Sequence, residues 1–183
     1  AKQIPKRIET HGVRRTDSFA WLKADNWQEV MRDPSVLPRD IKAYLEKENS
    51  YTEEIMKDTK ALQRKLFSEM RGRIKEDDAS VPLPDGPYAY YERHRKGGQY
   101  PLFCRKPKGE KERRKEKIFF DGDREGKGKG HFGIGAAEHS PDHALFAYCI
   151  DITGAEYYSI YVRDIATGKD LPDVVHKARG EIV

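Results

Sequence analysis

The most constraining feature of the sequence is a change of hydrophobic period between residues 76 and 86. Before this joint, apolar residues recur at the spacing of an α-helix. After it, short stretches alternate apolar and polar residues and are separated by tight turns, as in an antiparallel meander. We therefore predict an α+β chain with a helical part at residues 1–78 and an antiparallel β-meander at residues 79–183.

The helical part begins with residues 1–25, which show no sustained period and are predicted to form an extended arm. Asn26 and Glu29 have the spacing of a capping box at the start of a short helix. Pro38 suits the first position of a second helix, because that position needs no backbone N–H. The two longer helices carry one apolar stripe each, so we expect another surface to cover them. The expected helices run over residues 27–32, from Pro38 to about residue 56, and from Asp58 to about residue 75.

The second part is predicted to contain short strands connected by turns. A turn at residues 96–99 joins the first two strands, and a basic stretch at residues 106–117 follows them. Residues 121–130 are rich in glycine and are expected to form a flexible loop. The expected strands cover residues 88–93, 102–105, 118–120, 132–137, 144–150 and 157–163, with one more after a turn at residues 166–169.

Charge and cysteine content limit the kinds of partner and compartment. The chain has 35 Lys and Arg against 31 Asp and Glu, with both signs interspersed, so no strong basic face for nucleic acid is expected. Cys104 and Cys149 lack the spacing of metal ligands, and their small number favours a reducing compartment. No apolar run reaches the length of a membrane span or resembles a signal peptide. We expect a cytoplasmic protein with no membrane partner.

No catalytic or cofactor-binding motif in the sequence has the neighbouring residues that its chemistry requires. None of the seven serines lies in the Gly-x-Ser-x-Gly turn of an α/β-hydrolase nucleophile. Gly128, Gly130 and Gly133 match a dinucleotide fingerprint by letter, but a strand rather than a helix is expected after them. We therefore predict no catalytic, cofactor-binding or metal-binding residues and no cofactor. The six histidines are interpreted as structural or surface residues: His11, His94, His131, His139, His143 and His176.

One segment has the construction of a β-propeller blade. Ser140-Pro141-Asp142 forms a tight turn between two strands, Gly154 lies in the next hairpin, and Asp164 to Gly168 turns into an outer strand. With this blade, the segments AYLEKENSYTEEIM and LFSEMRGRIKEDDASVPLPDGPYAYYERHRKGGQYPLFCRK resemble the N-terminal region of the oligopeptidase B (protease II) branch of the prolyl oligopeptidase family. The resemblance runs over essentially the whole chain and is weakest in the basic stretch and the Gly-rich loop.

The resemblance implies a serine peptidase in which a helical extension and a seven-bladed propeller cover an α/β-hydrolase domain. That enzyme would cut short peptides after Lys or Arg, and the propeller would limit access to its active site. The present chain would hold the extension, two blades and, at residues 180–183, the opening of a third. The catalytic domain is absent from it, so we expect no hydrolysis by the chain alone.

The expected partners follow from the same resemblance. They are the catalytic domain of the parent protein, which the helices would brace, and short basic-residue peptides as substrates of that parent. Unpaired blade edges would also favour self-association of the chain. Two alternatives stay open at this point. One is a standalone protein-binding module with propeller-like blades, and the other is a small basic nucleic-acid-binding protein.

Overall fold

The computed structural model of the chain describes residues 1–112 and 115–182. It divides into two compact units, Ala1–Gly72 and Arg73–Val183. The division that we proposed from the sequence lies at residues 78–79. In the described part of the chain, no helix combines the length and the apolar character of a membrane span.

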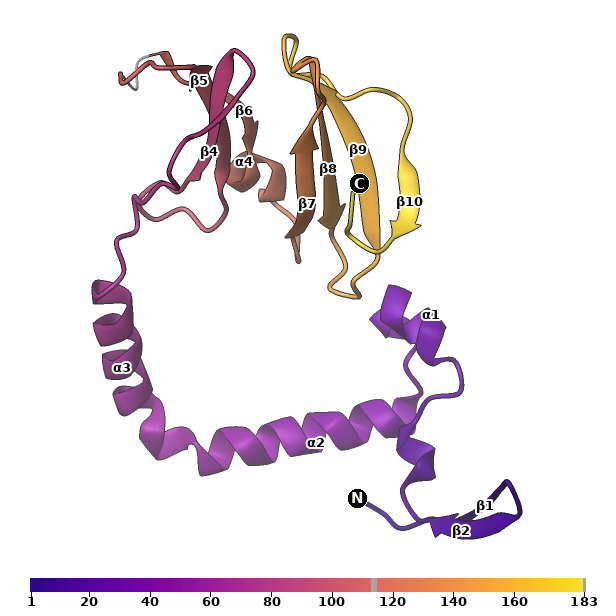
Figure 1. The fold of residues 1–183 in the computed structure, drawn as a ribbon. Coiled ribbons are helices and arrows are strands. Elements are labelled where there is room, and N and C mark those ends of the chain that lie inside the picture. The colour runs from indigo at the N-terminus through magenta and orange to yellow at the C-terminus, as the bar shows by residue number, and fades with distance from the viewer. Residues whose placement is uncertain (113–114, 183) are drawn as a thin grey trace. The chain divides into compact units, whose positions relative to one another are not determined.

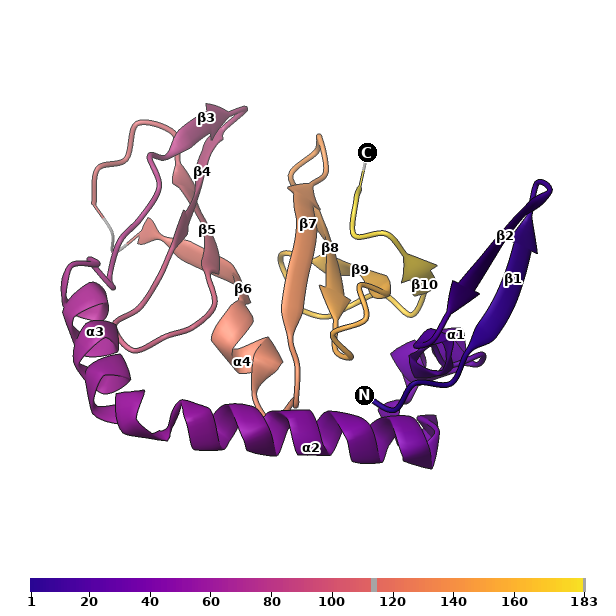
Figure 2. The ribbon, with the colours of Figure 1, turned by 90° about the horizontal axis from the view of Figure 1, so that it is seen from below.

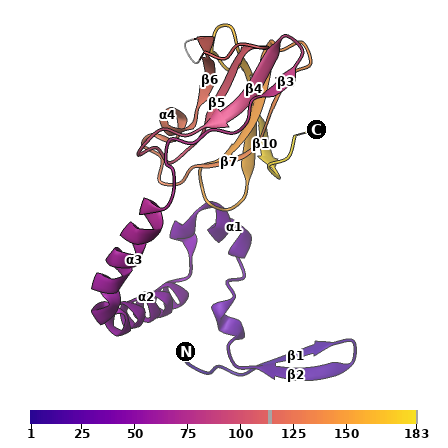
Figure 3. The same cartoon turned by 60° about the vertical axis from the view of Figure 1, so that its left-hand side comes forward.

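The first unit opens with a β-hairpin, so the prediction of an extended arm at residues 1–25 was wrong (Figure 3). Strand β1 (Lys6–Thr10) pairs antiparallel with β2 (Val13–Asp17). His11 and Gly12 both have positive φ, 51° and 77°, which suits a two-residue turn matched to the strand twist. The turn residues are a His-Gly pair. Because the two strands are mostly charged and exposed, they lack the alternation of apolar and polar residues from which strands are predicted.

The helices of the first unit lie where the apolar period indicated. The short helix α1 coincides with the prediction, but its capping box does not form: the Asn26 amide donates to the carbonyl oxygen of Val36 at 3.2 Å instead. Pro38 stands at the N-cap of α2 rather than inside the helix, and α3 ends at Gly72 rather than near residue 75. The helical elements are η1 (Ala20–Leu22), α1 (Trp27–Arg32), η2 (Pro34–Val36), α2 (Arg39–Ile55), η3 (Lys57–Thr59) and α3 (Lys60–Gly72).

The two long helices meet at an angle through η3 (Figure 1). Only Ile41 of α2 is buried, and no residue of α3 is. The apolar stripes of both helices therefore remain exposed within the unit, as amphipathic helices without a partner surface would be. Exposed large apolar side chains include Leu45, Tyr51, Ile55, Leu62, Leu66, Phe67 and Met70.

The first sheet of the second unit is a four-stranded antiparallel meander in the order β3-β4-β5-β6. Strand β3 was not predicted, because Pro84 interrupts its three residues. The Gly-rich loop begins instead with a short helix, α4 (Gly122–Gly126), whose N-cap Asp121 accepts a hydrogen bond from the backbone N–H of Arg124. The strands are β3 (Leu83–Asp85), β4 (Tyr88–Arg93), β5 (Leu102–Pro107) and β6 (Lys117–Asp121).

The second sheet repeats this plan in the order β7-β8-β9-β10 and lies beside the first (Figures 1 and 2). Its first three strands lie within two residues of their predicted bounds. Residues 180–182 form no strand, and Val183 lies outside the described residues, so the expected opening of a third blade is not seen. The strands are β7 (Gly133–His139), β8 (Leu145–Asp151), β9 (Tyr158–Asp164) and β10 (Val175–Ala178).

The two sheets share one aromatic core. Phe146 of the second sheet is 2% exposed, and its ring centroid lies 4.9 Å from that of Phe119 and 5.7 Å from that of Phe120, both in the first sheet. Tyr148 lies 4.6 Å from Phe120 in the same way. Since aromatic side chains bury the most area per residue, this contact holds the sheets face to face.

Candidate functional site

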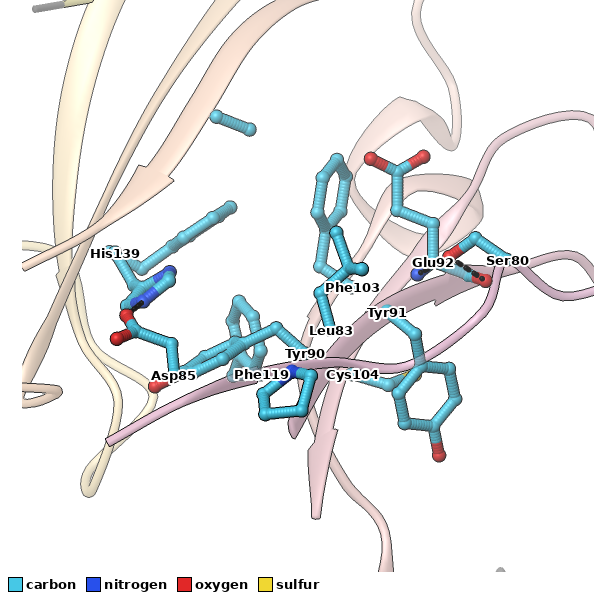
Figure 4. A pocket seen from close by; sticks show the side chains of 13 residues that line it. Ser80, Leu83, Asp85, Tyr90, Tyr91, Glu92, Phe103, Cys104, Phe119 and His139 are labelled. Atoms are coloured by element: carbon cyan, nitrogen blue, oxygen red, sulfur yellow. Dashed lines mark hydrogen bonds and ion pairs between the residues drawn. The ribbon is translucent and has the colours of Figure 1, made fainter. Parts of the chain in front are cut away.

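A cavity of about 260 Å³ opens between the two sheets of the second unit (Figure 4). Its floor is aromatic and belongs to the shared core, whereas its rim carries an acid and an imidazole. Contributions from both sheets are therefore needed to form it. The lining includes Leu83, Asp85, Tyr90, Phe119, His139 and Phe146.

At the rim, the carboxylate of Asp85 contacts the imidazole of His139. Oδ2 of Asp85 lies 2.7 Å from Nε2 of His139, although the residues are 54 positions apart in the sequence. The hydrogen bond with His139 lowers the pKa of the Asp85 carboxyl from its ordinary value. The ring of His139 also stacks on that of Tyr90, at 3.7 Å between centroids and 9° between planes. His139 is thus held from two sides by residues of the first sheet.

His143 lies in the turn between β7 and β8 and approaches the same group. Its Nδ1 lies 3.0 Å from the hydroxyl of Tyr90. Nη1 of Arg105 donates to the backbone carbonyl oxygen of His143 at 2.5 Å. His143 has a φ of 62°, a left-handed conformation that is uncommon outside glycine. The side chains of the first sheet therefore hold both the backbone and the ring of His143.

The sequence already places His139 and His143 beside one turn, and the structure brings this pair against an acid from the other sheet. His139 and His143 converge with Asp85, whereas the other four do not join this group. His176 lies on β10, where its Nδ1 is 3.0 Å from the hydroxyl of Ser159. Sequence reasoning did not pair Asp85 with these histidines, because the pairing depends on the packing of one sheet against the other.

A second polar cluster, built around Arg163, lies against the rings of Phe120 and Tyr148 in the core. The Arg163 side chain is 4% exposed and donates to Asp170 at 2.7 Å and to Glu125 of α4 at 3.0 Å. Its Nη2 donates to the hydroxyl of Tyr148 at 3.0 Å. Because every contact involves the guanidinium fork, this cluster satisfies a buried charge and joins β8, β9 and α4.

The cysteines show no sign of reactivity. Both thiols are free and buried in strands, Cys104 in β5 and Cys149 in β8. Burial raises the pKa of the Cys104 thiol to about 12 and also raises that of Cys149. Since the thiolate is the nucleophile, neither side chain suits covalent catalysis at neutral pH.

These features define the class of protein. Two consecutive four-stranded antiparallel sheets, packed face to face and each a simple meander, are neighbouring blades of a β-propeller. The chain belongs to the prolyl oligopeptidase family: the family model described as "Prolyl oligopeptidase, N-terminal beta-propeller domain" matches residues 1–183. The predicted membership is thereby confirmed.

Solved structures of relatives share the fold of the whole chain. Oligopeptidase B from Leishmania major superposes with a TM-score of 0.87 at 26% identity and covers 100% of this chain. Oligopeptidase B from Trypanosoma brucei, in a closed form with covalently bound antipain, gives a TM-score of 0.84 at 30% identity, again over 100% of the chain. The chain covers 27% and 26% of these two proteins, respectively.

Curated relatives agree with this assignment. Dipeptidyl aminopeptidase BI from Pseudoxanthomonas mexicana is 33% identical over 94% of this chain, and Protease 2 from Moraxella lacunata is 30% identical over 96%. The chain spans 24% of the length of each. The match is therefore to about a quarter of the length of these two peptidases.

Proposed function

We propose that this chain is the non-catalytic N-terminal part of a serine oligopeptidase that cleaves short peptides after Lys or Arg. The observation that carries the proposal is the superposition of the entire chain on oligopeptidase B from two organisms. In this role the blades limit access to a catalytic domain supplied by the remainder of the parent protein. The chain alone has no peptidase activity, because it contains no serine in a nucleophile turn.

A peptidase assay tests the substrate class. The 183-residue chain and a version extended to the natural terminus of the protein are compared on short peptides with Lys, Arg or Ala before the cleaved bond. We expect cleavage after Lys and Arg by the extended version and none by the chain alone. Cleavage after Ala at an equal rate would contradict the proposed specificity.

A second candidate is release of dipeptides, which the 33% identity with a dipeptidyl aminopeptidase favours. The two candidates differ in their need for a free amino terminus. A substrate with a blocked amino terminus separates them: the oligopeptidase cleaves it, whereas a dipeptidyl aminopeptidase requires the free amine. Cleavage of the unblocked peptide alone would replace the first candidate with the second.

We also propose that α2 and α3 brace the propeller against the catalytic domain of the parent. Their exposed apolar stripes need a cover, since a patch of this kind marks a contact surface. Deleting residues 1–78 from the extended protein should lower both its thermal stability and its activity. If stability and activity were unchanged, the bracing role would be wrong.

Without the remaining blades, the chain should self-associate. The edge strands β3 and β10 expose Leu83 and Val175, at 69% and 60%, and their outer backbone groups are available for pairing. Sedimentation velocity of the 183-residue chain should show dimers or larger species that increase with concentration. A monomer at every concentration would contradict this part of the proposal.

A further inference from the structure

We propose that Asp85, His139 and His143 bind a divalent transition-metal ion, with Zn²⁺ the best match, at the rim of the inter-blade cavity. One ligand atom from each of the three side chains lies within 4.8 Å of the others. The three come from two turns: Asp85 closes β3, whereas His139 ends β7 and His143 lies in the turn that follows it. This site is independent of the peptidase role proposed above.

The separation of the ligand atoms is close to that of a zinc site. Tetrahedral Zn²⁺ with bonds of about 2.0–2.1 Å needs ligand atoms roughly 3.3 Å apart. Asp85 and His139 are already at 2.7 Å, so an inserted ion would spread this pair slightly. The Asp85 side chain is 59% exposed and has room to rotate into place. The adjustment can therefore be made by an exposed carboxylate, and both rings can keep their contacts.

The orientation of His143 is consistent with an Nε2 ligand. Its Nδ1 is engaged by the Tyr90 hydroxyl, the arrangement by which outer partners fix the tautomer of a metal-binding imidazole. Nε2 lies against the backbone of Gly86, the residue after Asp85, and a Cβ at position 86 would come within 2.3 Å of it. Only glycine at this position lets Nε2 reach the neighbourhood of the carboxylate.

The orientation of His139 is also fixed before any ion arrives. Its ring is stacked on Tyr90 with the planes 9° apart, which leaves Nε2 directed at Asp85. An ion pair alone would satisfy Asp85 and His139 without the second imidazole. The convergence of a third donor is what distinguishes this group from a simple surface pair.

The donor set selects the class of metal. Two imidazole nitrogens and one carboxylate suit Zn²⁺ and its neighbours in the transition series, whereas Mg²⁺ and Ca²⁺ prefer oxygen ligands throughout. Three protein ligands leave a fourth position for water. Because Asp85 belongs to one sheet and the two histidines to the other, a bound ion would cross-link neighbouring blades.

Isothermal titration with ZnCl₂ tests the site in the metal-free chain. We expect one Zn²⁺ per chain, and a loss of affinity of about 10-fold or more in His139→Gln and in His143→Gln. His94→Gln is the matched control, because His94 is an exposed histidine of the same unit outside the cluster, and its affinity should equal that of the unchanged chain. No binding of Zn²⁺ would overturn the proposal, as would unchanged affinity in both cluster variants.

A second variant separates the loss of a zinc ligand from misfolding of the chain. Asp85→Asn alters an exposed side chain at a hairpin, so its circular dichroism should match that of the unchanged chain while its Zn²⁺ affinity falls about 10-fold or more. Excess ZnCl₂ should also raise the midpoint of thermal unfolding of the unchanged chain, whereas CaCl₂ should not. Equal shifts with both salts, or full affinity in Asp85→Asn, would overturn the site. None of these measurements depends on peptidase activity.

Discussion

Replacing Phe146 with alanine tests whether the aromatic contact between the two sheets holds the second unit together. The ring is 2% exposed and touches aromatic rings of both sheets. Loss of a buried phenylalanine generally costs about 3–5 kcal/mol, from lost transfer free energy and from the void that remains. Phe146 also lines the existing cavity, so the new void joins open space. We therefore expect the lower end of the range, about 3 kcal/mol.

The chain contains probes that separate the two units. Both tryptophans, Trp21 and Trp27, lie in the first unit, whereas eight of the ten tyrosines lie in the second. Urea unfolding followed by the near-ultraviolet circular dichroism of tyrosine reports mainly the second unit. With a slope of about 2 kcal/mol per molar urea, the expected loss lowers its midpoint by roughly 1.5 M. The tryptophan fluorescence transition should stay where it is.

Ile152→Ala provides the matched control, since this large apolar side chain is 54% exposed in the turn after β8. Its unfolding free energy should change by no more than about 0.5 kcal/mol. A loss below about 1 kcal/mol for Phe146→Ala would refute the view that these aromatic contacts join the sheets, because it would lie nearer the roughly 0.5 kcal/mol of a surface substitution than the cost of removing a buried aromatic ring. An equal shift of the tryptophan transition would show that the two units unfold together.

Three further predictions concern the second unit. Iodoacetamide should label neither Cys104 nor Cys149 at neutral pH until urea unfolds the chain, because burial raises the pKa of both thiols. Mass spectrometry of the folded chain checks this, and rapid labelling of either thiol would contradict it. Gly135→Ala should markedly lower the melting temperature, because the new Cβ would lie 2.7 Å from Sγ of Cys149 and 2.8 Å from a backbone carbonyl oxygen; an unchanged melting temperature would refute this close approach. Burial opposes ionisation of Asp170, but its bonds with Arg163 and a tyrosine hydroxyl lower the pKa below the ordinary 3.8. Ionised Asp170 therefore contributes stability above pH 3.8, and this contribution is lost as the pH falls through the lowered pKa. The difference in unfolding free energy between the unchanged chain and Asp170→Asn, measured in urea, should therefore shrink in acid. A difference that grows in acid would contradict the prediction.

Much of the strand and helix content could be predicted because its signals are local. The alternation of β4, the short apolar run of β8 and the tight turn that begins at Ser140 each predict a strand from neighbouring residues. The apolar period of α2 likewise specifies a helix. Two predictions failed for different reasons. The hairpin of β1 and β2 has almost no apolar residues to reveal its strands, and the Asn26 side chain bonds to a carbonyl 10 residues away instead of capping its helix.

The candidate site could not be predicted in the same way. His139 and His143 are close in sequence, but nothing local indicates that Asp85 will meet them. That meeting requires the turn after β3 to face the turn after β7, which follows from how the aromatic faces of two sheets fit together. Side-chain packing over a separation of 54 residues has no periodic signal in a single sequence.

The sequence by itself determined the change from helices to a meander, the position of most strands, the lack of a nucleophile turn and the family resemblance. Each of these depends on short runs of neighbouring residues. Only the tertiary structure decided which faces of the sheets are buried against each other, how Arg163 is neutralised and which histidines meet an acid. The physical reason is that burial and electrostatic pairing are properties of surfaces brought together by folding, and such surfaces collect residues from distant parts of the chain.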